Sequence, residues 1–232
     1  MKRDRLAGLV SLGLIFAGNS APAQLLPDTT LGTETSIVTP QSARHLIEGG
    51  ATRGTNLFHS FLEFNVGENQ RVDFANPATI HNILTRVTGT NVSNILGTLG
   101  VEGGANLFLL NPNGIIFGPN AQLDIRGSFV ATTANSILFD NGIEYGAINP
   151  QAPPLLTVSV PLGLQYGSNN TGIIRNEGIL SVGGNLTLGA GNLDLQGQLW
   201  ANGDLTLQAT DTLRVRDSAT HPFIAASGGK LV

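Results

Sequence analysis

Residues 184–188 read Gly184-Asn185-Leu186-Thr187-Leu188, and two related segments follow: Gly191-Asn192-Leu193-Asp194-Leu195 and Gly203-Asp204-Leu205-Thr206-Leu207. Each segment alternates apolar and polar residues, which is the signature of a half-buried strand. A Gly-Asn or Gly-Asp pair opens each segment and marks a turn. This part of the chain therefore predicts short strands separated by tight turns.

The leucines of this region recur at a second, longer interval. Leu180 and Leu199 are separated by the same interval as Leu186 and Leu205, and Leu193 and Leu213 by one residue more. Three short strands therefore complete one period of about 20 residues, as in a three-sided parallel β-helix whose equivalent leucines stack inside. A β-sandwich also has short strands and turns, but it does not require strands of successive periods to match. We therefore predict an all-β solenoid.

A similar spacing occurs earlier in the chain. Leu109, Ile116, Leu123, Val130 and Ile137 follow one another at every seventh position. Three such steps predict a period of about 21 residues per coil in this region, with these five side chains pointing inward.

The first residues have the pattern of an export signal. Lys2, Arg3 and Arg5 precede an apolar run over residues 6–17, and Ala21-Pro22-Ala23 supplies a small-x-small cleavage site. The run is shorter than the roughly 20 residues that a membrane-spanning helix needs. We predict that residues 1–23 are a signal peptide cut between Ala23 and Gln24, rather than a buried N-terminal helix. The mature protein is then exported, without a helical membrane anchor.

The composition narrows the range of partners. Without residues 1–23, the 12 basic and 16 acidic residues fall to 9 and 15, a net charge of −6. The chain has no basic patch and few aromatic residues for base stacking, so nucleic acid is not an expected partner. Cysteine is absent, which fits either a chain kept unfolded in the periplasm or a core large enough to need no disulfides.

The sharpest local motif is Asn111-Pro112-Asn113-Gly114-Ile115. Asn, Pro, Asn and Gly in this order suit a type I turn, with Pro setting φ at the second position and Gly closing the turn. Apolar residues 107–110 precede the motif and 115–117 follow it. We predict a corner between two strands, with Asn111 hydrogen-bonded in an internal polar ladder.

Together with this motif, three other segments resemble a known family: Asn56-Leu57-Phe58-His59-Ser60-Phe61, Phe64-Asn65-Val66 and Asn106-Leu107-Phe108-Leu109-Leu110. The span from about Gly54 to Asn135 resembles the N-terminal secretion domain (haemagglutination activity domain) of filamentous haemagglutinin-type exoproteins of two-partner secretion. Asn111 to Ile115 match the family's N-P-N-G-I motif. A second family motif, N-P-N-L, is matched only in part, by Asn76 and Pro77.

The resemblance implies a right-handed β-helix that begins with an N-terminal cap. It also implies a partner: the periplasmic domains of a cognate outer-membrane transporter would recognise the unfolded domain. The domain would then fold beyond the outer membrane, and folding would help to draw out a passenger. The expected localisation is therefore secreted or cell-surface.

These observations divide the mature chain into four parts. Residues 24–50 are the expected cap, 51–146 the secretion-domain core, and 169–232 regular coils. The coils are expected to stop in mid-coil, as in a truncated gene, a fragment or a stand-alone secretion domain. Residues 147–168 are rich in proline, including Pro153, Pro154 and Pro161. We predict that they form a loop or hairpin outside the β-helix.

The sequence leaves two other functions open. The solenoid could be an adhesin that binds cells or glycans directly, or a β-helix enzyme acting on polysaccharides. The charged candidates for catalysis are scattered: Asp124 with Arg126, Asp194 with Asp204, and Arg214 with Arg216 and Asp217. The first pair is expected to form a surface ion pair, and no convergent carboxylate pair stands out. We therefore predict no enzymatic activity.

Metal and cofactor sites are not expected either. His45, His59, His81 and His221 lie far apart and none has the spacing of zinc ligands. The Gly-Asn and Gly-Asp pairs do not form the nonapeptide calcium repeat, so they are interpreted as turns.

Overall fold

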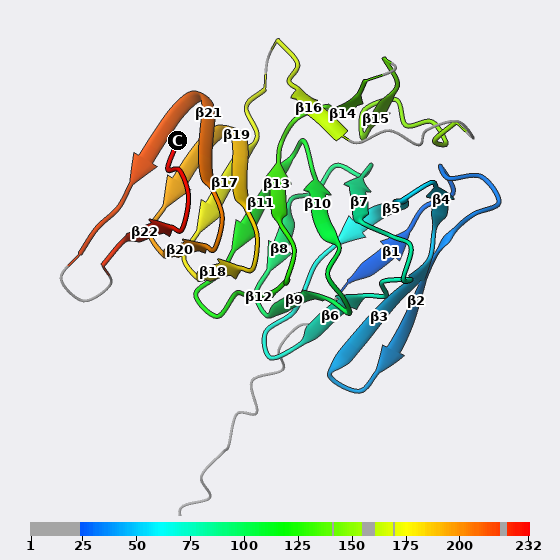
Figure 1. Cartoon of the computed structure of the whole chain (residues 1–232), viewed down its shortest axis with the longest axis horizontal. Coiled ribbons are helices and arrows are strands. Elements are labelled where there is room, and N and C mark those ends of the chain that lie inside the picture. Colours follow the sequence, from blue (N-terminus) through cyan, green and yellow to red (C-terminus); the bar gives the residue numbers. More distant parts are fainter. Residues whose placement is uncertain (1–23, 141, 155–160, 169, 219–221) are drawn as a thin grey trace, which may run out of the picture.

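The computed structural model describes residues 24–140, 142–154, 161–168, 170–218 and 222–232 (Figure 1). These residues contain strands and no helix. Most of the strands pair in parallel with strands one coil away, and they form three faces of a solenoid. The prediction of an all-β fold with a parallel β-helix is confirmed.

The first face carries the longest strands. Its parallel order is β5 (Asn56–Phe64), β7 (Asn82–Val87), β10 (Asn106–Leu110), β13 (Phe129–Thr132), and then the first parts of β19 (Leu186–Leu195) and β21 (Leu205–Val215). β19 and β21 bend at an irregularity between Ala190 and Asn192 and continue into the second face.

The second face contains β8 (Ser93–Ile95), β11 (Gly114–Phe117), β17 (Ile173–Asn176) and the second parts of β19 and β21. The third face runs in the order β3 (Arg44–Gly49), β6 (Arg71–Phe74), β9 (Thr98–Val101), β12 (Gln122–Asp124), β18 (Ile179–Val182), β20 (Gln198–Ala201) and β22 (Ile224–Ser227). One turn of the chain visits all three faces, so each coil is a layer one strand thick.

The leucine register predicted from the spacing is confirmed. Leu180 pairs with Leu199, and Leu186 pairs with Leu205. Leu193 pairs with Leu213 across the longer step. Leu186, Leu193 and Leu199 are at most 1% exposed. Each buried leucine stabilises the stack by about 2 kcal/mol through removal of apolar surface from water.

The period of about 21 residues predicted for the earlier coils is wrong, because the observed steps are longer: 22 residues from β10 to β13, 24 from β7 to β10 and 26 from β5 to β7. Val130 pairs with Phe108, and Leu109 pairs with Ala131 instead of Val130. A slip of one residue exchanges the inner and outer faces of a strand. Val130 is accordingly only partly buried, and Ile137 lies in a strand outside the solenoid.

Antiparallel strands cover the N-terminal end of the stack. β1 (Leu25–Pro27) and β4 (Ala51–Arg53) both pair with β5, and β2 (Ser36–Gln41) forms a hairpin with β3. Figure 1 shows this hairpin projecting beside the first coils. Because an open strand edge is a site for pairing with another chain, these strands protect the first coil.

A three-stranded antiparallel sheet leaves the solenoid between β13 and β17. It consists of β14 (Ser136–Phe139), β15 (Glu144–Gly146) and β16 (Pro161–Gln165), and Figure 1 shows it along one side of the first face. We call the segment from the start of β14 to the end of β16 the excursion; it begins at Ser136, ahead of the loop or hairpin predicted over 147–168. β11 pairs directly with β17, so the stack continues without a gap.

This sheet gives the first face a second hydrophobic core. Phe139 and Tyr145 of the excursion cluster with Phe58, Leu84 and Leu110, which point outward from the solenoid. The ring of Tyr145 meets that of Phe58 edge-on, with 4.8 Å between centroids. Strands β5 and β7 are therefore buried on both sides, which explains why so many of their residues are apolar.

A line of polar groups joins the coils at the start of the first face. The rungs are hydrogen bonds of 2.7–2.9 Å between consecutive members of one series: Asn56, Asn82, Asn106, Ser128, Asn185, Asp204 and the backbone N–H of Lys230. In each rung a side-chain oxygen accepts a hydrogen bond from the next coil. This polar ladder aligns the coils at one corner along the length of the solenoid.

Candidate functional site

The Asn111–Gly114 segment forms the corner between β10 and β11. The backbone N–H of Gly114 donates to the carbonyl of Asn111 at 3.1 Å, which closes the turn. The φ of Gly114 is +131°, and a Cβ there would lie 2.9 Å from the carbonyl oxygen of Ile173. Both the turn and the close approach of the next coil therefore require glycine at this position.

The side chain of Asn111 is fully buried and hydrogen-bonded. Its amide nitrogen donates to the carbonyl of Asn91 and to the hydroxyl of Ser93, both at 3.0 Å. Its oxygen accepts from the backbone and the side chain of Asn113, whose amide also donates to the carbonyl of Gly89 at 2.8 Å. Asn111 is therefore not a rung of the polar ladder; it ties this corner to the preceding coil.

Asn76 and Pro77 form a different corner, between β6 and β7. The amide of Asn76 donates to the carbonyls of Pro77 and Ile80, both at 3.0 Å. Its oxygen accepts from the backbone N–H of Ala105 in the next coil at 3.1 Å. Asn76 thus stabilises its own turn and holds the neighbouring coil.

Of the predicted cleavage residues, Ala23 lies outside the described residues. The carbonyl of Gln24 accepts a hydrogen bond from the N–H of Asn65 at 2.9 Å. The strand pairing of the cap therefore starts directly after the predicted cleavage position.

Among the described residues Arg86 is the largest fully buried side chain, and no sequence motif points to it. Its guanidinium donates to the hydroxyls of Ser60 and Thr30 at 2.9 and 2.8 Å. It also donates to the carbonyls of Gly146 and Gln151 in the excursion, both at 2.9 Å. One buried cation therefore joins the cap, the first face and the excursion.

Two neighbouring groups complete this cluster. The Arg86 guanidinium lies 4.3 Å from the centre of the Tyr145 ring, a cation–π contact. Asp28 accepts hydrogen bonds from Thr30, Ser60 and Thr88. Burial opposes the charged form of Asp28, but these hydrogen bonds outweigh it and lower the pKa of the carboxyl group.

Arg53 makes a second connection between the cap and the excursion. It forms a two-point ion pair with Glu34, at 3.0 and 2.6 Å, and donates to the carbonyls of Pro153 and Pro154, both at 3.2 Å. The hydrogen bonds from Arg53 lower the pKa of Glu34. The signal that could have revealed both arginines is their place inside short strands that are otherwise largely uncharged.

The charged residues considered for catalysis do not converge. Asp124 pairs with Arg71 at 2.5 Å, and not with Arg126 as predicted. Arg71 on β6 reaches across β9 beside Gly100, where a Cβ would lie 3.0 Å from an Nη of Arg71. Asp204 accepts from the N–H of Lys230 in the polar ladder, whereas Asp194 binds arginines on the second face.

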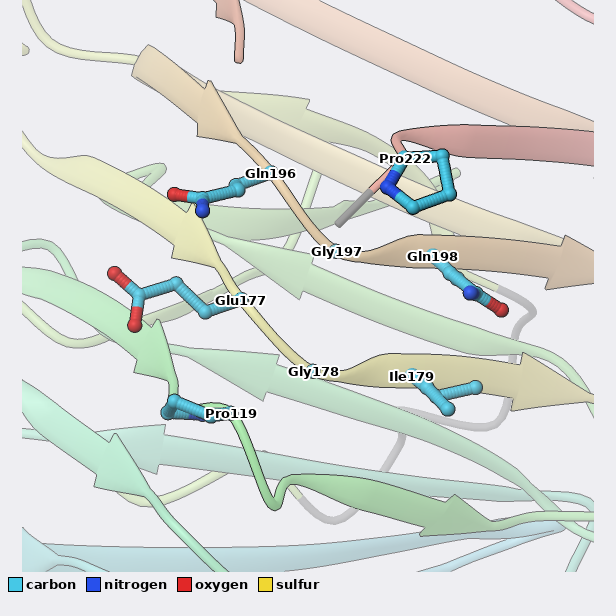
Figure 2. Close-up of a pocket in the computed structure, with 8 residues that line it drawn as sticks. All are labelled: Pro119, Glu177, Gly178, Ile179, Gln196, Gly197, Gln198 and Pro222. Atoms are coloured by element: carbon cyan, nitrogen blue, oxygen red, sulfur yellow. The ribbon is translucent and has the colours of Figure 1, made fainter. Parts of the chain in front are cut away.

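A shallow pocket lies at the corner between the second and third faces (Figure 2). Its lining consists of Pro119, Glu177, Gly178, Ile179, Gln196, Gly197, Gln198 and Pro222. Figure 2 shows Gly178 and Gly197 one above the other, and a Cβ on Gly197 would lie 2.1 Å from the carbonyl oxygen of Gly178. The lining contains one carboxylate, whereas general acid–base hydrolysis of glycosides uses two.

The histidines do not gather at one place. His59 is buried beside Ser36, whose hydroxyl lies 3.1 Å from its Nδ1, and burial lowers the pKa of His59 to about 3. His221 lies outside the described residues. Among the residues that are described, no group of three or more His, Asp or Glu side chains could hold a metal ion. This same part of the chain includes no helix able to cross a bilayer.

Known proteins resemble the chain over most of its length in structure and over a shorter stretch in sequence. The secretion domain of HMW1 from Haemophilus influenzae superposes with a TM-score of 0.57 and 20% identity, covering 82% of this chain and 45% of that one. The heme/hemopexin-binding protein of Haemophilus influenzae (strain ATCC 51907 / DSM 11121 / KW20 / Rd) is 35% identical over 79 residues, which is 34% of this chain and 8% of that protein.

A second heme/hemopexin-binding protein from Haemophilus influenzae is 30% identical over 82 residues, 35% of this chain and 9% of its own length. The chain therefore matches less than a tenth of the length of these curated relatives. Residues 23–226 match the family described as the TPS secretion domain. With this match over most of its length and a parallel β-helix as its fold, the chain belongs to the TPS secretion domain family.

Proposed function

We propose that this domain directs an exoprotein to a cognate outer-membrane transporter, which binds it unfolded, and that it then nucleates the β-helix outside the cell. Residues 1–23 would take the chain across the inner membrane first and be removed after Ala23. The mature protein would be released or held at the cell surface. Membership of the TPS secretion domain family supports this route, because exoproteins of the family cross the outer membrane.

The observation that carries the proposal is the burial of Asn111. Its side chain is 0% exposed and all its polar contacts lie within the domain. A transporter therefore cannot contact this side chain in the folded protein. If the motif Asn111 to Ile115 is recognised, recognition occurs while the chain is extended, and pairing of an extended segment with a strand of the partner is a suitable mode.

The geometry of the cap supports nucleation from the N-terminal end. β1 and β4 cover β5, and β5 also pairs with β7 in parallel. Each later coil adds to a template that already exists, so folding can propagate in one direction. Propagation of this kind would oppose the return of an emerging chain through the transporter.

The test separates recognition from stability. Asn111→Ala and Pro112→Ala are each expressed with the cognate transporter, and the secreted fraction is measured alongside the urea midpoint of the purified domain. Asn202→Ala, on an exposed corner, is the matched surface control. Leu193→Ala is the stability control, because it weakens the core on β19, two strands after the motif's Ile115 on the second face.

We expect Asn111→Ala to lower secretion at least fivefold more than Leu193→Ala does at a comparable loss of stability. Asn202→Ala should be secreted like the unaltered protein. If the Asn111 and Leu193 variants are secreted equally, the motif has no role in recognition and serves only as a structural corner. Secretion that does not depend on the transporter would refute the proposal itself.

A further inference from the structure

The outer surface of the second face carries a row of charged side chains. Arg175 on β17, Asp194 on β19 and Arg214 on β21 are directly opposite one another in the strand register. Arg216 follows two residues after Arg214 and points to the same side, because side chains alternate along a strand. The row therefore contains three guanidinium groups and one carboxylate.

The carboxylate of Asp194 is bound mainly by one of these arginines, Arg216. The Nε of Arg216 donates to one of its carboxylate oxygens at 2.8 Å, and an Nη of Arg216 contacts the other. This two-point pair is the favoured geometry between arginine and a carboxylate. The carboxylate is 9% exposed, so an incoming anion would meet the guanidinium groups before it met Asp194.

The other two arginines are less fully paired. The buried Nε of Arg175 lies 3.3 Å from Asp194 in an ion pair without a hydrogen bond, and 40% of the Arg175 side chain is exposed. Arg214 is exposed and forms no ion pair within the described part of the chain. An arginine presents five N–H donors in a planar fork that fits sulfate and carboxylate groups.

A groove runs along this row, and its lining also offers neutral polar groups. Thr171, Asn192 and Thr212 lie beside the three arginines. Asn192 on β19 pairs with Thr212 on β21, so these two side chains form a second row parallel to the charged one. Hydroxyl and amide groups next to arginines suit a ligand that carries both charges and hydroxyls.

We propose that this groove binds an acidic polysaccharide, with its sulfate or carboxylate groups on Arg175 and Arg214 and its hydroxyls on Thr171, Asn192 and Thr212. The chain as a whole has a formal net charge of −4 and does not attract polyanions by its overall field. Binding must therefore come from this local excess of positive charge. The site lies on the outside of the solenoid and extends to β21, the last described strand of this face.

The experiment measures binding of the purified full chain to dextran sulfate, polygalacturonate and uncharged dextran at physiological salt. Dextran sulfate and dextran share a backbone, so their comparison isolates the sulfate groups. Polygalacturonate tests carboxylates in place of sulfates. The variants are Arg175→Gln with Arg214→Gln, and as a control Arg126→Gln with Arg214→Gln; Arg126 is an exposed arginine outside the groove.

We expect one of the two acidic polymers to bind and dextran not to bind. The variant lacking Arg175 and Arg214 should lose at least tenfold in affinity, and the control, which keeps Arg175, should lose about threefold. Both variants carry the same net charge, and both should keep the urea midpoint of the unaltered protein.

Equal losses of affinity in the two variants would show that binding depends on net charge alone, and would overturn the site. Failure of both acidic polymers to bind would overturn it as well. Binding to vesicles containing phosphatidylglycerol, without binding to either polymer, would assign the groove to a lipid surface and reject the polysaccharide. None of these outcomes depends on secretion through a transporter.

Discussion

The two ends of the solenoid are stabilised in different ways. In the coils after the excursion, the rung from Asn185 to Asp204 spans 19 residues and leucines stack on leucines. In the first coils the corresponding steps are 26 and 24 residues, and the strands carry buried His59, Thr85 and Arg86. The later coils depend on their neighbours alone, whereas the first coils also depend on a segment 60 to 100 residues away. The regular end is therefore modular, and the capped end is built as one cooperative unit.

The strongest test of this difference is Arg86→Met. It removes hydrogen bonds to Gly146, Gln151 and Thr30 and leaves those groups without this partner. We expect a loss of about 4 kcal/mol in the free energy of unfolding, measured by urea denaturation. Arg126→Met, on an exposed side chain, should change it by less than about 0.5 kcal/mol. A loss below about 1 kcal/mol in Arg86→Met would mean that the excursion does not stabilise the cap.

A pair of leucines tests the modular end. Leu193→Ala should lower the free energy of unfolding by about 3 kcal/mol, because the side chain is buried within the stack. Leu213→Ala is its matched control in the same leucine register, and 46% of Leu213 is exposed. The control should lose less than about 1 kcal/mol. Similar losses at the two positions would show that the last coil is packed as tightly as the one before it.

The buried imidazole of His59 makes the capped end sensitive to pH. Its pKa is lowered to about 3 in the folded protein, while an exposed histidine has a pKa near 6.5. The unfolded chain therefore binds this proton more readily, so stability falls as the pH drops below about 6.5. Between pH 6.5 and 4.5 we expect His59 to account for a loss of about 2 kcal/mol in the free energy of unfolding.

Two substitutions isolate this contribution. His59→Gln should reduce the loss of stability between pH 6.5 and 4.5, whatever its effect at neutral pH. His81→Gln, at an exposed position, should keep the full pH dependence. Parallel pH profiles for the unaltered protein and His59→Gln would contradict the assignment. The carboxyl groups of Asp28 and Glu34 have lowered pKa values, so in the folded protein they titrate below this pH range.

The smallest expected effect concerns Glu34→Gln. The carboxylate pairs with Arg53, but 41% of the Glu34 side chain is exposed, so water and salt screen the pair. We expect a loss below about 1 kcal/mol at low salt and a smaller one at about 1 M NaCl. Urea midpoints at the two salt concentrations measure this difference. A loss as large as that of Arg86→Met would show that Arg53 is the principal link to the excursion.

The same contrast explains how far the sequence could predict the structure. In the regular coils the period is short, so contacts such as Leu180 with Leu199 can be counted directly along the chain. In the earlier coils the turns differ in length, and the pairing of Val130 with Phe108 could not be found from a uniform spacing. The register there is set by turn geometry and by packing on both sides of the first face.

The candidate site could likewise be predicted only in part from the sequence. The turn chemistry of Asn111 to Gly114 is local, and it pointed to a corner. The bonds of Arg53 and Arg86 to the excursion join residues 60 to 101 positions apart, and no local pattern indicates such partners. The pairing of Asp124 with Arg71 depends on a glycine in the strand between them, which becomes visible only once the register is known.

The polar ladder has a consequence for how such a protein can change in length. Its rungs span steps from 19 to 57 residues, and yet the hydrogen-bond lengths stay between 2.7 and 2.9 Å. Insertions are therefore absorbed at the other corners, while the rung keeps every coil in phase. A gene could gain or lose whole turns, or acquire a new loop at a far corner, and each surviving layer would still begin at the same reference point.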